Sequence, residues 1–213
     1  MRVGASNNLG RDRIAPLLWR LALPAIFAQV VNALYNIVDR IYIGHIAEAG
    51  ALALTGLGVS FPILIILAAF GSLIGAGGPP LAAIAMGARH EERAEHYLGN
   101  ALSFTVIFSV IMTVVMLLAA EPLLRVFGAS DETMPYAQQY LDIYLLGTIF
   151  SMLGIGLGGF IATQGFAKTA MMTSVIGAVV NIVLDPIFIF WIGWGVRGAA
   201  VATVIAQAAS AAW

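Results

Sequence analysis

The sequence predicts an all-α polytopic membrane protein with six transmembrane helices. Of its 213 residues, 61% are hydrophobic and only 10% are charged, whereas a soluble domain carries about 25% charged residues. The apolar residues gather in runs long enough to cross a bilayer, which takes roughly 20 residues in a helix. Short polar segments separate these runs, as expected for a chain that crosses a membrane repeatedly.

Composition also excludes several classes of function. The net charge of −1 and the lack of a large basic block argue against nucleic-acid binding. With no cysteine, the chain has neither disulfides nor thiolate metal sites. The three histidines, His45, His90 and His96, fall near predicted loops, so no histidine metal cluster and no cofactor is expected.

The apolar runs define the expected elements. Residues 1–14 form a polar tail, and residues 15–213 form a six-helix transmembrane lobe. We expect helices at about 15–44, 50–77, 97–119, 135–161, 171–191 and from 197 onward. The last helix has about 24 Å of length before the sequence stops, less than the roughly 30 Å of a bilayer core. We therefore expect the lobe to be truncated within helix 6.

Several segments carry local signals. Pro24 predicts a kink in the first helix, and Gly71 and Gly75 predict close packing of the second helix against a neighbour. The third run is apolar on every side and predicts a lipid-facing wall. The charged segment 87–96 predicts a water-facing loop. The glycine run at 154–159 favours helix packing over dinucleotide binding, because no strand precedes it.

The most informative stretch is residues 175–191, an apolar run that contains Asn181, Asp185 and Pro186. A carboxylate at membrane depth is costly, so its default interpretation is a functional site. Pro186 removes a backbone donor and is expected to bend the helix beside that carboxylate. Asn181 and Asp185 are four residues apart and therefore share one helix face.

The basic residues predict the orientation. Seven of the ten lysines and arginines fall on the side of the N-terminus, and only Arg40, Arg125 and Arg197 fall on the other. The positive-inside rule then places the N-terminus in the cytoplasm.

With that orientation, Asp39, Tyr140, Asp185 and Thr203 lie in the same outer half of the bilayer, on four different helices. Asn32, Asn36 and Asp39 form one stripe, and Thr203 and Gln207 are four apart. We expect these polar faces to meet at one cavity, which Tyr144 also borders.

A simpler interpretation is that these groups are separate interhelical hydrogen bonds, each worth about 1 kcal/mol or less. It suits Gln29, Asn32 and Gln207. It suits the two aspartates poorly, because neither has an evident buried cation partner. Arg40 follows Asp39 but points about 100° away around the helix. Desolvation penalises an unpaired carboxylate, so each aspartate is able to take up a proton or a cation.

At these residues the chain resembles the multidrug and toxic compound extrusion (MATE) transporters, especially the bacterial NorM/DinF-like members. The resemblance rests on the Pro24-to-Asp39 pattern, LALTGLG at 52–58, N181-x-x-x-D185-P186 and GAAVAT at 198–203. It implies two six-helix lobes with a central substrate path, of which this chain is the amino-terminal one, in a bacterial inner membrane. The carboxy-terminal lobe would be a partner, together with the bilayer and small organic substrates.

The resemblance further implies that one site couples the driving ion, H⁺ or Na⁺, to transport. It assigns this site to Asp39, Tyr140, Asn181, Asp185 and Thr203, with Na⁺ ligands at Asp39, Asn181, Asp185 and Thr203. Asn32, Asn36, Tyr144 and Gln207 would line a substrate cavity, and Pro24 and Pro186 would act as hinges.

The function expected is export of organic, often cationic, compounds by a secondary antiporter rather than an enzyme. No GxSxG or GxGD motif supports an intramembrane protease. A flippase for lipid-linked sugars is an alternative, although it would favour a cationic cavity. A structural bundle without transport is another.

Overall fold

The computed structural model describes residues 14–47 and 49–213, and every regular element in them is a helix. Of the predicted tail at residues 1–14, only Ile14 is described, and it begins the first helix. The elements in chain order are α1 (Ile14–Gly44), α2 (Gly50–Gly87), α3 (Glu91–Val126), α4 (Met134–Leu146), α5 (Thr148–Thr163), α6 (Ala167–Pro186), the π-helical turn η1 (Ile187–Trp191) and α7 (Val196–Ala212).

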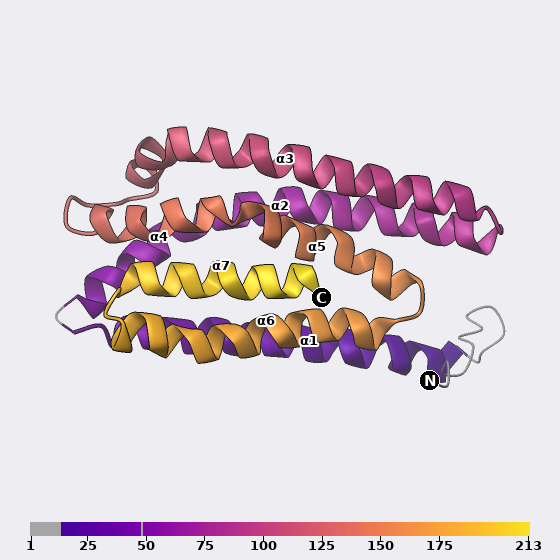
Figure 1. The fold of residues 1–213 in the computed structure, drawn as a ribbon, viewed down its shortest axis with the longest axis horizontal. Coiled ribbons are helices and arrows are strands. Elements are labelled where there is room, and N and C mark those ends of the chain that lie inside the picture. The colour runs from indigo at the N-terminus through magenta and orange to yellow at the C-terminus, as the bar shows by residue number, and fades with distance from the viewer. Residues whose placement is uncertain (1–13, 48) are drawn as a thin grey trace.

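The helices form an elongated bundle (Figure 1). The elements α2, α3, α4 and α5 pack with one another, while α1 lies along α6. Between these two groups runs α7, drawn in yellow, which contacts α4, α5 and α6. Most of one face of α7 is buried as a result, and many of these residues are alanines with almost no exposed surface.

Membrane-spanning helices dominate the described residues. Four are long and apolar enough to cross a bilayer: Leu18–Gly44, Gly50–Gly87, Glu91–Val126 and Ala167–Trp191. Taken as one segment, the pair α4 and α5, bent by 59°, passes the same test of length and composition. The sixth apolar segment, α7, has 17 residues. The predicted all-α polytopic fold is thus confirmed.

The boundary between the second and third helices differs from the prediction. The second helix continues through Gly75–Pro80 to Gly87, and the third begins at Glu91. Within a membrane, a segment that contains proline tends to stay helical. Unwinding it would expose backbone N–H and C=O groups where no water is present to bond them. The predicted loop at 87–96 is reduced to a turn, since Glu91 and Glu92 suit the first turn of a helix. Likewise, α3 extends to Val126, where Arg125 pairs with Glu121 at 3.2 Å.

The predicted continuous helix at 135–161 is broken at Gly147. A Cβ at Gly147 would lie 2.6 Å from the Val204 side chain, so α7 packs closely against the chain at this break. The backbone opened by the bend is partly satisfied from outside, because the Thr113 hydroxyl of α3 donates to the Leu145 carbonyl at 3.0 Å.

Glycines bring α2 and α5 together, as Gly71 and Gly75 predicted. A Cβ at Gly75 would stand 2.7 Å from the backbone carbonyl oxygen of Ile155, and one at Gly159 would stand 2.7 Å from Pro79. The glycine run at 154–159 therefore lies in a helix–helix interface, as expected.

The third helix is not the featureless wall that its composition suggested. One stripe of α3 is buried at a spacing of three or four residues, including the fully buried hydroxyl residues Thr105 and Ser109. Both hydroxyls bond to carbonyls of their own helix, so neither is left unsatisfied in the buried stripe. The opposite side exposes large apolar residues, as expected for contact with lipid.

Candidate cation site

Two buried carboxyl groups face each other where α1 lies along α6. Asp39 is 7% exposed and Asp185 is fully buried. Their side chains are within hydrogen-bonding reach of each other. Two carboxylates have only acceptors, so a hydrogen bond between them requires a shared proton. The pair as a whole is therefore suited to hold a positive charge.

Neighbouring helices complete this site with neutral groups. The Asn181 amide donates to Asp185 Oδ1 at 3.1 Å and to the Thr203 hydroxyl of α7 at 3.4 Å. The buried Tyr140 of α4 interacts in turn with Thr203 and lies near Asp39. The structure thus brings together all five residues that the sequence assigned to ion coupling, from four helices.

Three oxygen atoms of this cluster have no hydrogen-bond donor. They are Asp39 Oδ1, Asp185 Oδ2 and Asn181 Oδ1, each inaccessible to solvent. Buried acceptors are normally satisfied, and an unsatisfied one costs about 1–3 kcal/mol. Oxygen atoms without donors are also the ligands that hard cations such as Na⁺ prefer. These oxygens belong to Asp39, Asn181 and Asp185, three of the residues expected to bind Na⁺.

No basic side chain neutralises the pair within the described part of the chain. Arg40 attracts Asp39 electrostatically, but its guanidinium lies 5.2 Å from the centre of the Phe61 ring, on the surface of the bundle. The ion pairs between described side chains are formed by Arg125 and His96 with other acidic residues. Neither Asp39 nor Asp185 takes part in them. The site is therefore acidic.

Tyr35 belongs to the same cluster, although the sequence analysis did not single it out. It lies in electrostatic contact with Tyr144 and with both carboxyl groups. Its position four residues before Asp39 was the available signal, because such residues share a helix face.

The predicted polar stripe on α1 is only partly buried, since Asn36 lies at its exposed edge. This residue is exposed, and its amide donates to the Asn32 carbonyl of its own helix at 2.7 Å. Around α1, Asn36 lies about 60° from Asp39 on the exposed side, whereas Tyr35 lies about 40° away on the buried side. Asn32 is half-buried beside this edge.

Tyr144 and Gln207 meet next to the cation site. The Gln207 amide donates to the Tyr144 hydroxyl at 3.1 Å, and that hydroxyl also lies 3.3 Å from Ser151 Oγ, across the break between α4 and α5. The Tyr144 ring stacks on Tyr140 with centroids 5.9 Å apart. Tyr144 and Gln207 thus lie between helices, and their expected place in a substrate cavity stays a prediction.

The two expected hinge prolines differ in their local structure. Pro24 is buried within α1, which remains one helix from Ile14 to Gly44. After Pro186, α6 changes into η1, where Ile192 donates to the Ile187 carbonyl at 2.9 Å in place of a normal α-helical bond. Such π-turns often occur at functional sites.

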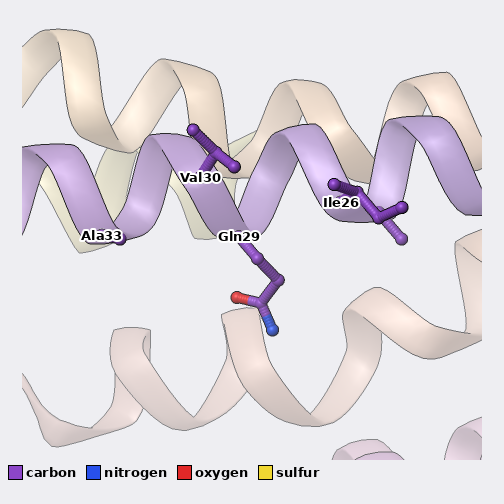
Figure 2. A pocket seen from close by; sticks show the side chains of 5 residues that line it. Ile26, Gln29, Val30 and Ala33 are labelled. Carbon is purple, nitrogen blue, oxygen red and sulfur yellow. The ribbon is translucent and has the colours of Figure 1, made fainter.

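Two open grooves lie along the exposed surface of α1. One of about 430 Å³ is lined by Ala25, Ile26, Gln29, Val30 and Ala33. Figure 2 shows Gln29 projecting from α1 beside Ile26 and Val30. Gln29 is exposed and makes no interhelical bond to a described residue, contrary to the simpler interpretation.

A bundle of several membrane spans with an ionisable pair buried between them is typical of membrane transport proteins. The family model MatE matches residues 24–187, and the chain belongs to this family. The predicted resemblance is confirmed.

Known relatives agree with this assignment. The chain is 27% identical over 191 residues to "Multidrug export protein MepA" of Staphylococcus haemolyticus, covering 90% of this chain and 42% of that protein. It is 29% identical over 196 residues to "DNA damage-inducible protein F" of Escherichia coli, covering 91% and 42%. A solved structure described as the outward-facing conformation of a multidrug resistance MATE family transporter superimposes with a TM-score of 0.85 at 32% identity, over 92% of this chain and 43% of that chain.

The chain spans somewhat less than half the length of these proteins. The six-helix unit accordingly corresponds to one lobe of a longer transporter in its relatives.

Proposed function

We propose that this chain is the amino-terminal lobe of a secondary antiporter that exports small organic compounds in exchange for inward flow of H⁺ or Na⁺. The observation that carries the proposal is the buried Asp39–Asp185 pair, which has no basic partner among the described residues. Its relatives named for multidrug export support the substrate class.

The pair provides a means of coupling. Occupancy by a cation removes the repulsion between two buried carboxylates, and its loss restores that repulsion across the α1–α6 contact. A cation drives a conformational change only by the difference in its affinity for the two states. Pro24 in α1 and the π-turn after Pro186 are the places where we expect these two helices to adjust.

The oxygen atoms of the site bear on which ion binds there. One shared proton satisfies the two carboxyls but leaves Asn181 Oδ1 without a donor. Unsatisfied oxygens of this kind, together with a hydroxyl, are the ligands that Na⁺ prefers. We therefore favour Na⁺ as an occupant of this site, with H⁺ competing for it.

Partner and orientation follow from the same proposal. The exposed grooves along α1 would contact substrate or the carboxy-terminal lobe, and the N-terminus would lie in the cytoplasm of a bacterium. The acidic site gives no support to a flippase for lipid-linked sugars, because a pyrophosphate group requires basic partners.

The test is export of ethidium, an organic cation, by the complete transporter that contains this lobe, in vesicles energised with either a Na⁺ or a pH gradient. We expect Asp39→Asn and Asp185→Asn to abolish export while expression remains intact. Asp131→Asn is the matched control, since Asp131 is an exposed aspartate. Undiminished export by both site variants would overturn the proposal, and the gradient that supports wild-type export identifies the ion.

A further inference from the structure

A line of polar groups continues from the cation site along α7. Apart from Arg197 in its first turn, α7 has three polar residues, Thr203, Gln207 and Ser210, spaced so that they share one face. We call these three residues the α7 polar seam. From Thr203 to Ser210 the seam covers about 10 Å of helix. It runs from the carboxyl pair toward the end of the bundle where α1 and α6 begin (Figure 1).

Each residue of the seam meets polar groups from neighbouring helices. Thr203 accepts from Asn181, Gln207 donates to Tyr144 at 3.1 Å, and Ser210 donates to the Thr173 carbonyl of α6 at 2.9 Å. Tyr144 adds its contact with Ser151 of α5. The seam therefore has oxygen-bearing partners on α4, α5 and α6 along its whole length.

One atom in the seam distinguishes it from ordinary interhelical bonding. Gln207 Oε1 is inaccessible to solvent and has no hydrogen-bond partner. An amide that served only to hold helices together would have both of its polar ends satisfied at this depth. The amide nitrogen of the same side chain contacts the Tyr144 hydroxyl, which in turn contacts the hydroxyl of Ser151. This set of neutral oxygens suits a water molecule or a small cation held weakly.

We propose that the α7 polar seam, with Tyr144 and Ser151, is the part of the cation path that adjoins the carboxyl pair, and that it leads in the direction of the end of the bundle where α1 begins. The proposal rests on the proposed ion-coupled function. Neutral oxygens bind a cation more weakly than the carboxyl pair does, and a conduction path requires this, because each station has to release what it binds.

Accessibility of cysteines substituted along α7 tests this path without measuring transport. The sequence has no cysteine, so each introduced thiol is unique. Gln207→Cys and Ser210→Cys in the full chain, in sealed vesicles, are treated with a small cationic methanethiosulfonate reagent added to either side. Ala206→Cys is the matched control, because Ala206 is buried on α7 at the same depth and lies off the seam.

We expect both seam thiols to react at least about tenfold faster than the Ala206 thiol, from one side of the membrane only. A reagent with an anionic group should react much more slowly. Equal, slow reaction at all three positions would overturn the proposal, because the seam would then be dry packing. If Gln207→Cys fails to fold, Ser151→Cys takes its place with the same expectation.

A second measurement tests whether the path is used. Gln207→Met keeps the volume but removes both polar atoms, and Gln207→Asn keeps a neutral amide. We expect Gln207→Met to slow release of bound cation about tenfold without changing the amount bound at equilibrium, and Gln207→Asn to slow it much less. Unchanged release in Gln207→Met, or loss of equilibrium binding, would contradict the path. If the proposed function itself is wrong, the unmodified chain will bind neither Na⁺ nor H⁺. That result is distinct from both of the outcomes above.

Discussion

Gly198 sets the distance between α7 and the π-turn that follows Asp185. A Cβ placed on Gly198 would lie 2.6 Å from the carbonyl carbon and oxygen of Phe188 and 2.9 Å from the Ile189 nitrogen. These are backbone atoms, which cannot turn away as a flexible side chain does. Ordinary contact begins at 3.4 Å, so Gly198→Ala requires α7 and η1 to separate by about 0.8 Å.

That displacement reaches the cation site. The Asn181–Thr203 hydrogen bond is already 3.4 Å long, and an added separation of this size breaks it. Overpacking of this kind costs about 1–3 kcal/mol, and an interhelical hydrogen bond in a membrane averages about 0.6 kcal/mol. We therefore expect Gly198→Ala to destabilise the chain by about 2 kcal/mol and to weaken cation binding.

Thermal unfolding in nanodiscs and equilibrium binding of radioactive sodium measure the two effects. A loss of about 2 kcal/mol corresponds to a fall in Tm of roughly 4–8 °C for a chain of this size. Gly154→Ala is the matched control, because a Cβ there meets no atom within 4 Å. An unchanged Tm and unchanged binding in Gly198→Ala would refute the reasoning.

Three further predictions concern the scaffold. Arg89 has a φ of 59°, so Arg89→Gly should raise the Tm by relieving about 1 kcal/mol of backbone strain. Gly75→Ala should lower the Tm, because its Cβ would lie 2.7 Å from a backbone carbonyl of α5; Gly77→Ala, with open space around it, should not. Thr113→Val removes the donor to the Leu145 carbonyl and should cost about 1–2 kcal/mol in chemical unfolding. An unchanged midpoint there would show that the carbonyl finds another partner.

Residue patterns and the family resemblance together predicted the five residues that the structure brings together at the candidate cation site. Asp39 and Asp185 stand out because a carboxylate within an apolar run is costly, and Asn181 and Thr203 follow from four-residue spacing and a common depth. Tyr35 was missed because tyrosine is unremarkable at membrane depth; only its spacing from Asp39 signals its place.

Other features depend on tertiary contacts that no local pattern reveals. The bend at Gly147 arises where α7 presses Val204 against the chain and Thr113 satisfies an opened carbonyl. The end of α2 at Gly87 was missed because Pro79 and Pro80 remain inside the helix. The start of α3 at Glu91 was missed because its charged first turn resembles a loop. The exposure of Asn36 was not evident from the sequence, because helical periodicity shows which residues share a face but not where its buried part ends.

Cation uptake by the chain tests the central claim about Asp39 and Asp185 most directly. Equilibrium uptake of radioactive sodium, and of protons at fixed pH, would be measured in nanodiscs for the unmodified chain and for its Asp39→Asn and Asp185→Asn variants. We predict uptake of about one cation per chain, Na⁺ and H⁺ displacing each other, and its loss in either variant. Equal uptake by all three chains would contradict the claim that this pair holds the coupling ion.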